Sequence, residues 1–160
     1  MALFGTNQIK ASIIILNYNG AAYVERCLGS ILKNRCPNFE VIFIGNNSTD
    51  GSADLAMRLF GSDPRLIIIR NSENLGFSIG NSIGFKRTRA KYVIVLNNDT
   101  EVAENFIDTL VNLAESDETI GSVGCKIVQQ DGRIRYGPMY ISYGFIVHAL
   151  QKQTYEKLML

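Results

Sequence analysis

Four short runs of apolar residues, rich in isoleucine and valine, recur along the chain between polar, glycine-containing segments. They span residues 13–16, 41–44, 66–69 and 92–96. Each run is continuously apolar rather than alternating, which is typical of strands buried on both faces. The pattern therefore predicts a parallel β-sheet.

Segments of helical length lie between and after these runs. In the first, Val24, Leu28, Ile31 and Leu32 repeat at the spacing of one helix face. The predicted helices cover residues 21–33, 52–60, 77–89 and 103–115. Because strands and helices alternate, the fold class is α/β: a Rossmann-like, mostly parallel central sheet with helices on both faces.

The last part of the chain has a different pattern. Residues 121–128 are predicted to form a further strand, and Asp131-Gly132 before Ile134 is a two-residue hairpin signal. We therefore expect an antiparallel hairpin at the edge of the sheet. Residues 139–150 are apolar with polar breaks, and they fit either a buried strand or a surface-associated stretch.

Length, composition and charge fit one globular domain. The chain has 160 residues, 46% of them hydrophobic, which is enough for an ordinary core in a single domain spanning residues 1–160. Sixteen basic and fifteen acidic residues are spread along the sequence and give a net charge of +1. Nucleic acid is therefore not expected as a partner.

Cysteine usage and hydropathy indicate a reducing, aqueous compartment. Cys27, Cys36 and Cys125 lack the paired short spacing of a zinc or redox motif, and we interpret them as reduced packing thiols. No apolar run has the length that crosses a bilayer, and residues 1–5 lack the organisation of a signal peptide. These observations predict a soluble, cytoplasmic protein without a transmembrane segment.

Polar side chains follow the first predicted strand. Asn17, Tyr18 and Asn19 precede Gly20. In an open parallel sheet, ligands bind beyond the carboxyl ends of the strands, so a ring flanked by amides is suited to stack on a base and hydrogen-bond to it. Asparagine and glycine are also common turn formers, and a purely structural turn is the alternative interpretation.

The loop after the second predicted strand is also rich in side-chain amides. Asn46 and Asn47 follow Gly45, and Ser48 and Asp50 come next. Capping of the following helix explains Ser48 and Asp50. It does not explain the amides before them, which favours a base or ribose contact there.

The fourth predicted strand leads directly into Asn97, Asn98 and Asp99. A carboxylate held by a buried strand at a cleft floor suits a divalent cation bound to a pyrophosphate. Mg²⁺ or Mn²⁺ takes oxygen ligands, and one carboxylate suffices where phosphate and water supply the others, so metal affinity without substrate is expected to be low. A turn that caps a helix is the alternative interpretation.

Glycines mark the third predicted helix at every fourth position, at Gly76, Gly80 and Gly84. For Gly80 and Gly84 we favour close packing of the helix on the sheet. Asn81 is then expected to point into the cleft.

Four of these segments, taken in order, resemble the family 2 glycosyltransferases. They are residues 12–20, 46–52, 74–77 and 96–100, and the Asn-Asn-Asp in the last resembles the rhamnosyltransferase-like branch, where it stands for the usual Asp-x-Asp. The resemblance implies a GT-A fold, a UDP- or dTDP-sugar donor, a divalent cation and an inverting displacement. It also implies a saccharide or lipid-linked acceptor and work at the cytoplasmic face of the membrane.

The resemblance also implies roles for individual residues. Tyr18 would flank the base, Asn46 would lie near the base or ribose, and Asp99 would hold the cation. Asn97 and Asn98 would line the sugar and ribose. The full set expected at the nucleotide sugar is Asn17, Tyr18, Asn19, Asn46, Ser48, Asn81, Asn97 and Asn98.

Two departures from the family pattern bear on function. Gly45 stands where the family usually has an aspartate, which removes one expected acceptor for the nucleotide. The family takes its general base from a downstream Glu-Asp element, whereas Glu156 is the only carboxylate side chain after Asp131 and does not match that element. We therefore assign no general base and expect a donor-binding portion that lacks the acceptor-binding part.

Two other classes of function are compared with a glycosyltransferase: a binding module and an oxidoreductase. A non-catalytic nucleotide-sugar-binding module, which keeps the cleft without the base, is the main alternative. A dinucleotide oxidoreductase is disfavoured, because no Gly-x-Gly-x-x-Gly follows the first strand. We interpret His148, in the apolar tail, as structural. An exposed sheet edge near that tail is compatible with an oligomer.

Overall fold

A parallel, four-stranded sheet forms the centre of the chain in the computed structural model, which describes residues 9–129, 131–136, 139–142 and 145–148. The strand order is β3-β2-β1-β4. The four strands are β1 (Ala11–Asn17), β2 (Phe39–Gly45), β3 (Leu66–Arg70) and β4 (Tyr92–Asn97). All four predicted strands are therefore confirmed, each extended by one to three residues.

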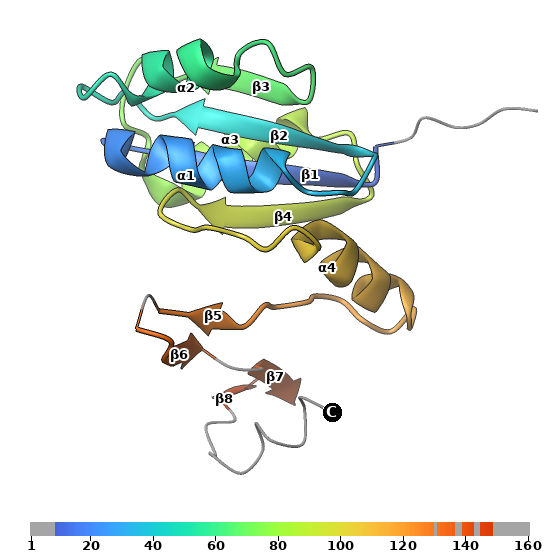
Figure 1. The fold of residues 1–160 in the computed structure, drawn as a ribbon. Helices are drawn as coiled ribbons and strands as arrows, with labels where there is room; N and C mark the ends of the chain where they lie inside the picture. Colours follow the sequence, from blue (N-terminus) through green and yellow to red (C-terminus); the bar gives the residue numbers. More distant parts are fainter. Residues whose placement is uncertain (1–8, 130, 137–138, 143–144, 149–160) are drawn as a thin grey trace, which may run out of the picture. The chain divides into compact units, whose positions relative to one another are not determined.

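Helices follow each of these strands, as predicted. They are α1 (Ala21–Leu32), α2 (Ser52–Phe60), α3 (Gly76–Arg87) and α4 (Phe106–Glu115). The helices α1 and α2 lie on one face of the sheet and α3 lies on the other (Figure 1). The predicted α/β class with helices on both faces is confirmed.

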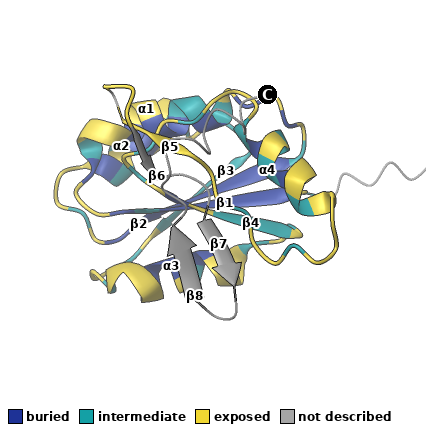
Figure 2. Ribbon diagram, turned by 90° about the horizontal axis from the view of Figure 1, so that it is seen from below, coloured by how far each residue is buried: buried dark blue, intermediate teal, exposed yellow. Residues whose placement is uncertain are grey.

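The burial of the strands explains why their sequences are continuously apolar. Strands β1 and β2 lie in the middle of the sheet and are almost entirely buried, whereas the edge strands β3 and β4 are only partly covered (Figure 2). Alternate residues of a strand face opposite sides, so a strand covered on both sides needs apolar residues throughout.

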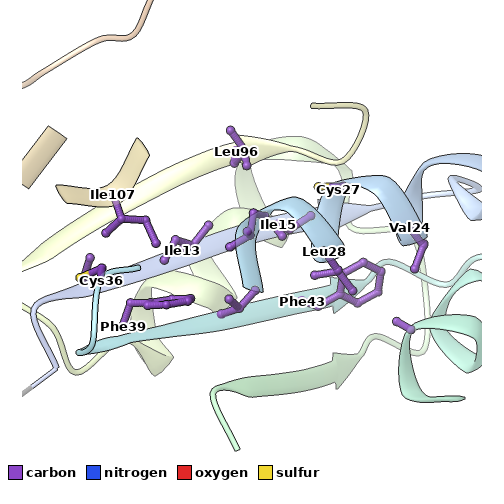
Figure 3. Packing of buried hydrophobic residues seen from close by; sticks show 14 of the residues in the cluster. Ile13, Ile15, Val24, Cys27, Leu28, Cys36, Phe39, Phe43, Leu96 and Ile107 are labelled. Carbon is purple, nitrogen blue, oxygen red and sulfur yellow. The ribbon is translucent and has the colours of Figure 1, made fainter. Parts of the chain in front are cut away.

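The main core lies between the sheet and α1. Ile13 and Ile15 of β1 and Phe43 of β2 pack with Leu28 and other buried residues of α1 (Figure 3). Burying side chains of this size stabilises the fold by about 1.5–3 kcal/mol each. This layer fixes the strand that carries the first polar loop.

The opposite face of the sheet packs closely against α3. A Cβ atom on Gly80 would collide with Leu16, and one on Gly84 would collide with Ile14. The expected role of these glycines, close packing of the helix on the sheet, is therefore confirmed.

The register of the strands brings three polar loops to one edge. Asn17 at the end of β1 lies level with Gly45 at the end of β2, and Leu16 lies level with Asn97 at the end of β4. The segments after β1, β2 and β4 therefore begin next to one another. That edge is where a parallel sheet binds ligands.

Residues 112–160 form a compact unit distinct from residues 1–111. Within it, β5 (Ile127–Val128) pairs with β6 (Ile134–Tyr136) in an antiparallel hairpin, and β7 (Met139–Ser142) pairs with β8 (Phe145–His148). The predicted hairpin forms, with Gly132 in the left-handed conformation at its turn.

Among the described residues, the hairpin forms a two-stranded sheet of its own, β5-β6, where an edge of the central sheet was expected. A turn signal specifies how its two flanking strands pair, but it carries no information about a third strand. The strand predicted over residues 121–128 also shortens to its last two residues, which are exposed.

The cysteines are free thiols. Cys27 and Cys36 are buried in the core, as predicted for packing thiols, whereas Cys125 is exposed. In the described part of the chain, no helix is long and apolar enough to cross a membrane.

Candidate functional site

Asn17 joins the three loops at the carboxyl edge of the sheet. Its side chain is fully buried. The Nδ2 of Asn17 donates to Ser52 Oγ at 2.7 Å, and its Oδ1 accepts from Asn98 Nδ2 at 2.8 Å. Its backbone carbonyl accepts from the Asn46 backbone N–H at 2.8 Å. Asn17 therefore links the segments that follow β2 and β4 to the end of β1.

Asn19 and Ser48 hold the first two loops together on the outside. The Asn19 backbone N–H donates to Ser48 Oγ at 3.0 Å, and Asn19 Oδ1 accepts from the Thr49 backbone N–H at 2.9 Å. Asn19 has a φ of 49°, a left-handed conformation that asparagine tolerates better than most residues. Tyr18, between these two fixed asparagines, is 51% exposed. Its ring is thus accessible at the rim of the site.

Asp50 caps two helices. Its Oδ1 accepts from the Ser52 backbone N–H at 3.0 Å, at the start of α2, and its Oδ2 accepts from the Ala21 backbone N–H at 2.8 Å, at the start of α1. Desolvation alone would raise the pKa of Asp50, but the hydrogen bonds from Ser52 and Ala21 outweigh it and lower the pKa. The capping of α2 was predicted, whereas the capping of α1 depends on a contact between two loops.

Asn46 is the centre of a second amide network. It is buried, and its Nδ2 donates to Asn74 Oδ1 at 2.7 Å. Its Oδ1 accepts from Asn71 Nδ2 at 2.9 Å and from the Leu75 backbone N–H at 3.2 Å. These bonds tie the end of β2 to the segment that leads into α3. Sequence reasoning missed Asn71, although it directly follows β3 as Asn46 directly follows β2.

The loop after β4 exposes the predicted metal ligand. Asn97 and Asp99 are exposed and Asn98 is half-buried. The Asn97 carbonyl accepts from the Thr100 backbone N–H at 3.2 Å and from Cys27 Sγ at 3.9 Å. Burial and the nearby Asp99 carboxylate raise the pKa of Cys27 to about 12, so this thiol stays protonated beneath the loop.

Asn81 lies in α3 and is only 6% exposed. Its Nδ2 donates to the Phe77 carbonyl at 2.9 Å, while its buried Oδ1 has no hydrogen-bond partner among the described residues. The amide is therefore set into the packing between helix and sheet, with one acceptor unused. Its expected contact with a ligand stays a prediction.

A sequence profile identifies the family. The profile described as "Glycosyl transferase family 2" matches residues 12–159, a span that includes every loop described above. The chain belongs to glycosyl transferase family 2.

Relatives in this family are longer than the chain. Glycosyltransferase GlyA of Streptococcus pneumoniae is 28% identical over 153 residues, which cover 93% of this chain and 20% of GlyA. The putative teichuronic acid biosynthesis glycosyltransferase TuaG of Bacillus subtilis is 25% identical over 146 residues, which cover 91% of this chain and 55% of TuaG. The match thus spans from a fifth to about half of these family 2 relatives.

Solved structures share the fold. TarS 1-349 of Staphylococcus aureus, in complex with UDP-GlcNAc, superposes with a TM-score of 0.63 at 20% identity over 68% of this chain and 32% of TarS. The mannosyltransferase PcManGT of Pyrobaculum calidifontis, in complex with GDP-Man and Mn²⁺, gives 0.69 at 22% identity over 75% of this chain and 36% of PcManGT. The predicted GT-A fold of this family 2 chain is confirmed.

The donor set at Asp99 fits a cation held jointly with a ligand. Among the described residues, no three side chains of histidine, cysteine, aspartate or glutamate gather into a metal site. Asp99 is exposed and the residues beside it offer neutral amide oxygens, which a hard cation also accepts. A Mg²⁺ or Mn²⁺ ion here would complete its shell with diphosphate and water oxygens.

Gly45, which departs from the family 2 pattern, has a packing environment of its own. A Cβ atom at this position would lie 3.1 Å from Ala53 Cβ of α2, closer than an ordinary contact. An aspartate here would therefore need α2 to shift. The glycine allows α2 to approach the end of β2, and it places no carboxylate at that point.

No described residue after Asp131 carries a carboxylate side chain that could match the family's downstream general base. Glu156, the only carboxylate side chain after Asp131, lies outside the described ranges. The backbone of His148 lies in β8, and its side chain is not among the parts of the chain that the structure describes.

Proposed function

We propose that this chain is the nucleotide-sugar-binding part of a glycosyltransferase. It would hold a UDP- or dTDP-sugar beyond the carboxyl ends of β1, β2 and β4, with Mg²⁺ or Mn²⁺ at Asp99. The observation that carries the proposal is the hydrogen bonding of Asn17, which gathers three loops beside an exposed tyrosine and an exposed aspartate.

Direct contact with the donor is assigned to the side chains that the loops leave exposed. Tyr18 would stack on the base, Asn97 would contact the sugar and ribose, and Asp99 would bind the cation. Asn19, Ser48 and Asn46 have polar atoms already hydrogen-bonded within the protein, so we expect them to act by shaping the loops. Asn81 would contribute through its unused Oδ1.

The chemistry of transfer suits a cation at this position. As the bond from the anomeric carbon to the diphosphate breaks, negative charge develops on the leaving group, and a bound Mg²⁺ or Mn²⁺ stabilises that charge without a proton transfer. We infer an inverting displacement, in which a base outside the described residues deprotonates the acceptor hydroxyl. The solved neighbours with UDP-GlcNAc, or with GDP-Man and Mn²⁺, support a donor of this class.

The acceptor is proposed to be a saccharide or a lipid-linked saccharide. Two relatives are described by the product whose biosynthesis they take part in: teichuronic acid for the putative glycosyltransferase TuaG and O-antigen for RfbC of Myxococcus xanthus. An acceptor of this kind would place the protein at the inner surface of the membrane, and association with that surface or with a further subunit is part of the proposal.

A binding module without transfer activity is the second candidate. In this candidate the loops after β1, β2 and β4 hold the donor, and no general base acts on an acceptor. The two candidates differ in a single experiment. Sugar transfer that appears only when the chain is extended to the length of its relatives would favour the transferase, whereas donor binding without transfer in both lengths would favour the module.

Titration calorimetry tests the donor site itself. We expect UDP or dTDP to bind this chain more tightly with Mn²⁺ than without it. Asp99→Asn should remove that increase, while Glu118→Gln, an exposed carboxylate in the second unit, should keep it. Binding that is equally metal-dependent in Asp99→Asn would overturn the assigned site, and failure of both nucleotides to bind would overturn the proposed function.

A further inference from the structure

Asn17 and Asn98 form a hydrogen bond across 81 positions of sequence, at 2.8 Å between Asn98 Nδ2 and Asn17 Oδ1. Strand β1, which ends at Asn17, lies between β2 and β4 (Figure 1). Because the Nδ2 of Asn17 is engaged by Ser52 Oγ at 2.7 Å, its amide is oriented so that the Oδ1 faces Asn98. A fully buried amide with both ends hydrogen-bonded has one defined orientation.

Gly20 leaves the space for this hydrogen bond. A Cβ atom at position 20 would overlap both Asn98 Nδ2 and Asn17 Oδ1. The backbone of Gly20 has a φ of −114°, which any residue adopts, so its conformation does not require glycine. The requirement is steric and comes from the two asparagines.

Asp99 depends on its neighbours in the chain for its position. Its carboxylate is exposed and makes no hydrogen bond or ion pair with the described residues. The residue before it is held by Asn17, and the turn around it is closed by the hydrogen bond from the Thr100 backbone N–H to the Asn97 carbonyl. The Asn17–Asn98 bond is therefore the side-chain contact that fixes this turn against β1.

We propose that Asn17 and Asn98 are positioning residues for the cation site: their hydrogen bond, which Gly20 makes possible, holds Asp99 where it can bind a metal ion. The inference rests on the proposed function, since it assumes a nucleotide and a cation at Asp99. It assigns Asn98 to the protein side of the site instead of to the sugar. A single carboxylate binds a cation well only when its position is fixed in advance, because freezing a mobile loop opposes binding.

Two variants break the bond in independent ways. Asn98→Ala removes the donor, and Gly20→Ala forces the two amides apart while leaving both in place. Gly29→Ala is the matched control, because a Cβ atom at this position in α1 would lie 3.8 Å from Phe60 Cζ, which is an ordinary contact. Circular dichroism and the melting temperature establish whether each variant folds. If one bond-breaking variant fails to fold, the other is enough to test the inference.

The measurement is the Mn²⁺ concentration that gives half-maximal UDP binding. We expect it to rise about three- to tenfold in Asn98→Ala and in Gly20→Ala, as for the loss of one hydrogen bond, and to stay unchanged in Gly29→Ala. UDP affinity without metal should stay within about twofold, because Asn19, the residue after Tyr18, is held by hydrogen bonds to Ser48 and Thr49 that neither variant removes. The double variant should resemble the single ones, since both changes break the same bond.

Amide hydrogen exchange at Thr100 gives a reading that does not depend on ligands. We expect the Thr100 N–H to exchange faster in both bond-breaking variants and at an unchanged rate in Gly29→Ala. An unchanged Mn²⁺ midpoint in variants of a chain that binds UDP with metal would overturn the inference and leave the proposed function standing. If the unaltered chain showed no metal-dependent UDP binding, that result would contradict both the proposed function and the role of Asn17 and Asn98 at the cation site.

Discussion

The two ends of the central sheet are cross-linked by different chemistry. At the carboxyl ends of the strands, neutral amides join the loops, with Asn17 at the centre. At the amino ends, Glu40 of β2 is only 3% exposed and accepts hydrogen bonds from Ser12 Oγ at 2.7 Å and from the Arg89 guanidinium at 2.9 Å. One end thus relies mainly on neutral amides, with the exposed Asp50 as a helix cap, and the other end buries a charge.

The two ends of these strands are suited to different roles, one to stability and the other to binding. A buried carboxylate must keep its partners, so the Glu40 end resists change. Hydrogen-bonded amides orient a loop without adding charge. The carboxylates near Asn17 are Asp50, which is held by backbone N–H groups, and the exposed Asp99. We therefore expect substitutions at the Glu40 end to affect mainly stability, and substitutions at the Asn17 end to affect mainly binding.

Removing Glu40 should have the largest effect on stability. Glu40→Ala leaves the buried hydroxyl of Ser12 without its acceptor and frees Arg89, and we expect a loss of about 2–3 kcal/mol in the free energy of unfolding. Urea denaturation measures it. Glu104→Ala, which removes an exposed ion pair with Arg35, should cost under about 1 kcal/mol. Equal losses in the two variants would remove the distinction between the two ends.

Replacing Asp99 should give the opposite result. Asp99→Asn keeps the size of an exposed side chain, so the free energy of unfolding should change by less than about 0.5 kcal/mol. Metal-dependent UDP binding should weaken at least about tenfold, or about 1.4 kcal/mol. Calorimetry and urea denaturation on the same preparation measure both quantities. A variant that unfolds as easily as Glu40→Ala would place Asp99 with the structural residues.

Removing the ring of Tyr18 should weaken binding with and without metal. Stacking of a base on an aromatic ring contributes about 1–3 kcal/mol, and for a half-exposed ring we expect the lower figure, about fivefold in affinity. Tyr18→Phe is the matched control and should keep most of the affinity. A loss confined to the metal-containing titration would argue that Tyr18 acts on the cation site and not on the base.

The pH dependence of stability should carry a small contribution from Glu40. Burial alone would raise its pKa, but the hydrogen bonds from Ser12 and Arg89 outweigh burial and lower the pKa below its ordinary value of 4.5. The stabilisation is therefore present above that pH and is lost as the pH falls through the lower value in the folded protein. Unfolding free energies from pH 3 to 6 should fall less steeply toward acid in Glu40→Gln. Identical slopes would contradict this assignment.

The sequence predicted those parts of the molecule that depend on local pattern. Continuous apolar runs identified all four strands of the central sheet, because burial on both faces leaves that mark directly on the sequence, and the segments of helical length between and after them indicated the helices. The antiparallel hairpin was located from its turn, whereas its pairing as a two-stranded sheet of its own was not predicted.

The sequence predicted where the candidate site lies, but it did not predict which of the site's side chains are exposed and which are buried. The amide-rich loops do meet at one edge, as the strand order requires, but the sequence does not distinguish an exposed asparagine from a buried one. Asn17 makes its bonds to residues 35 and 81 positions away, so its burial depends on the tertiary fold. Asn71 was missed for the same reason.

The cap that Asp50 provides for α1 has a consequence for the order of folding. The N-cap residue of α1, Gly20, has no side chain to satisfy the first backbone N–H groups, and the acceptor comes from the loop after β2. Until β2 has docked beside β1, the first turn of α1 lacks this partner and should fray. We therefore expect α1 and the loop after β2 to become structured in the same kinetic step, so that the site's first two loops form together.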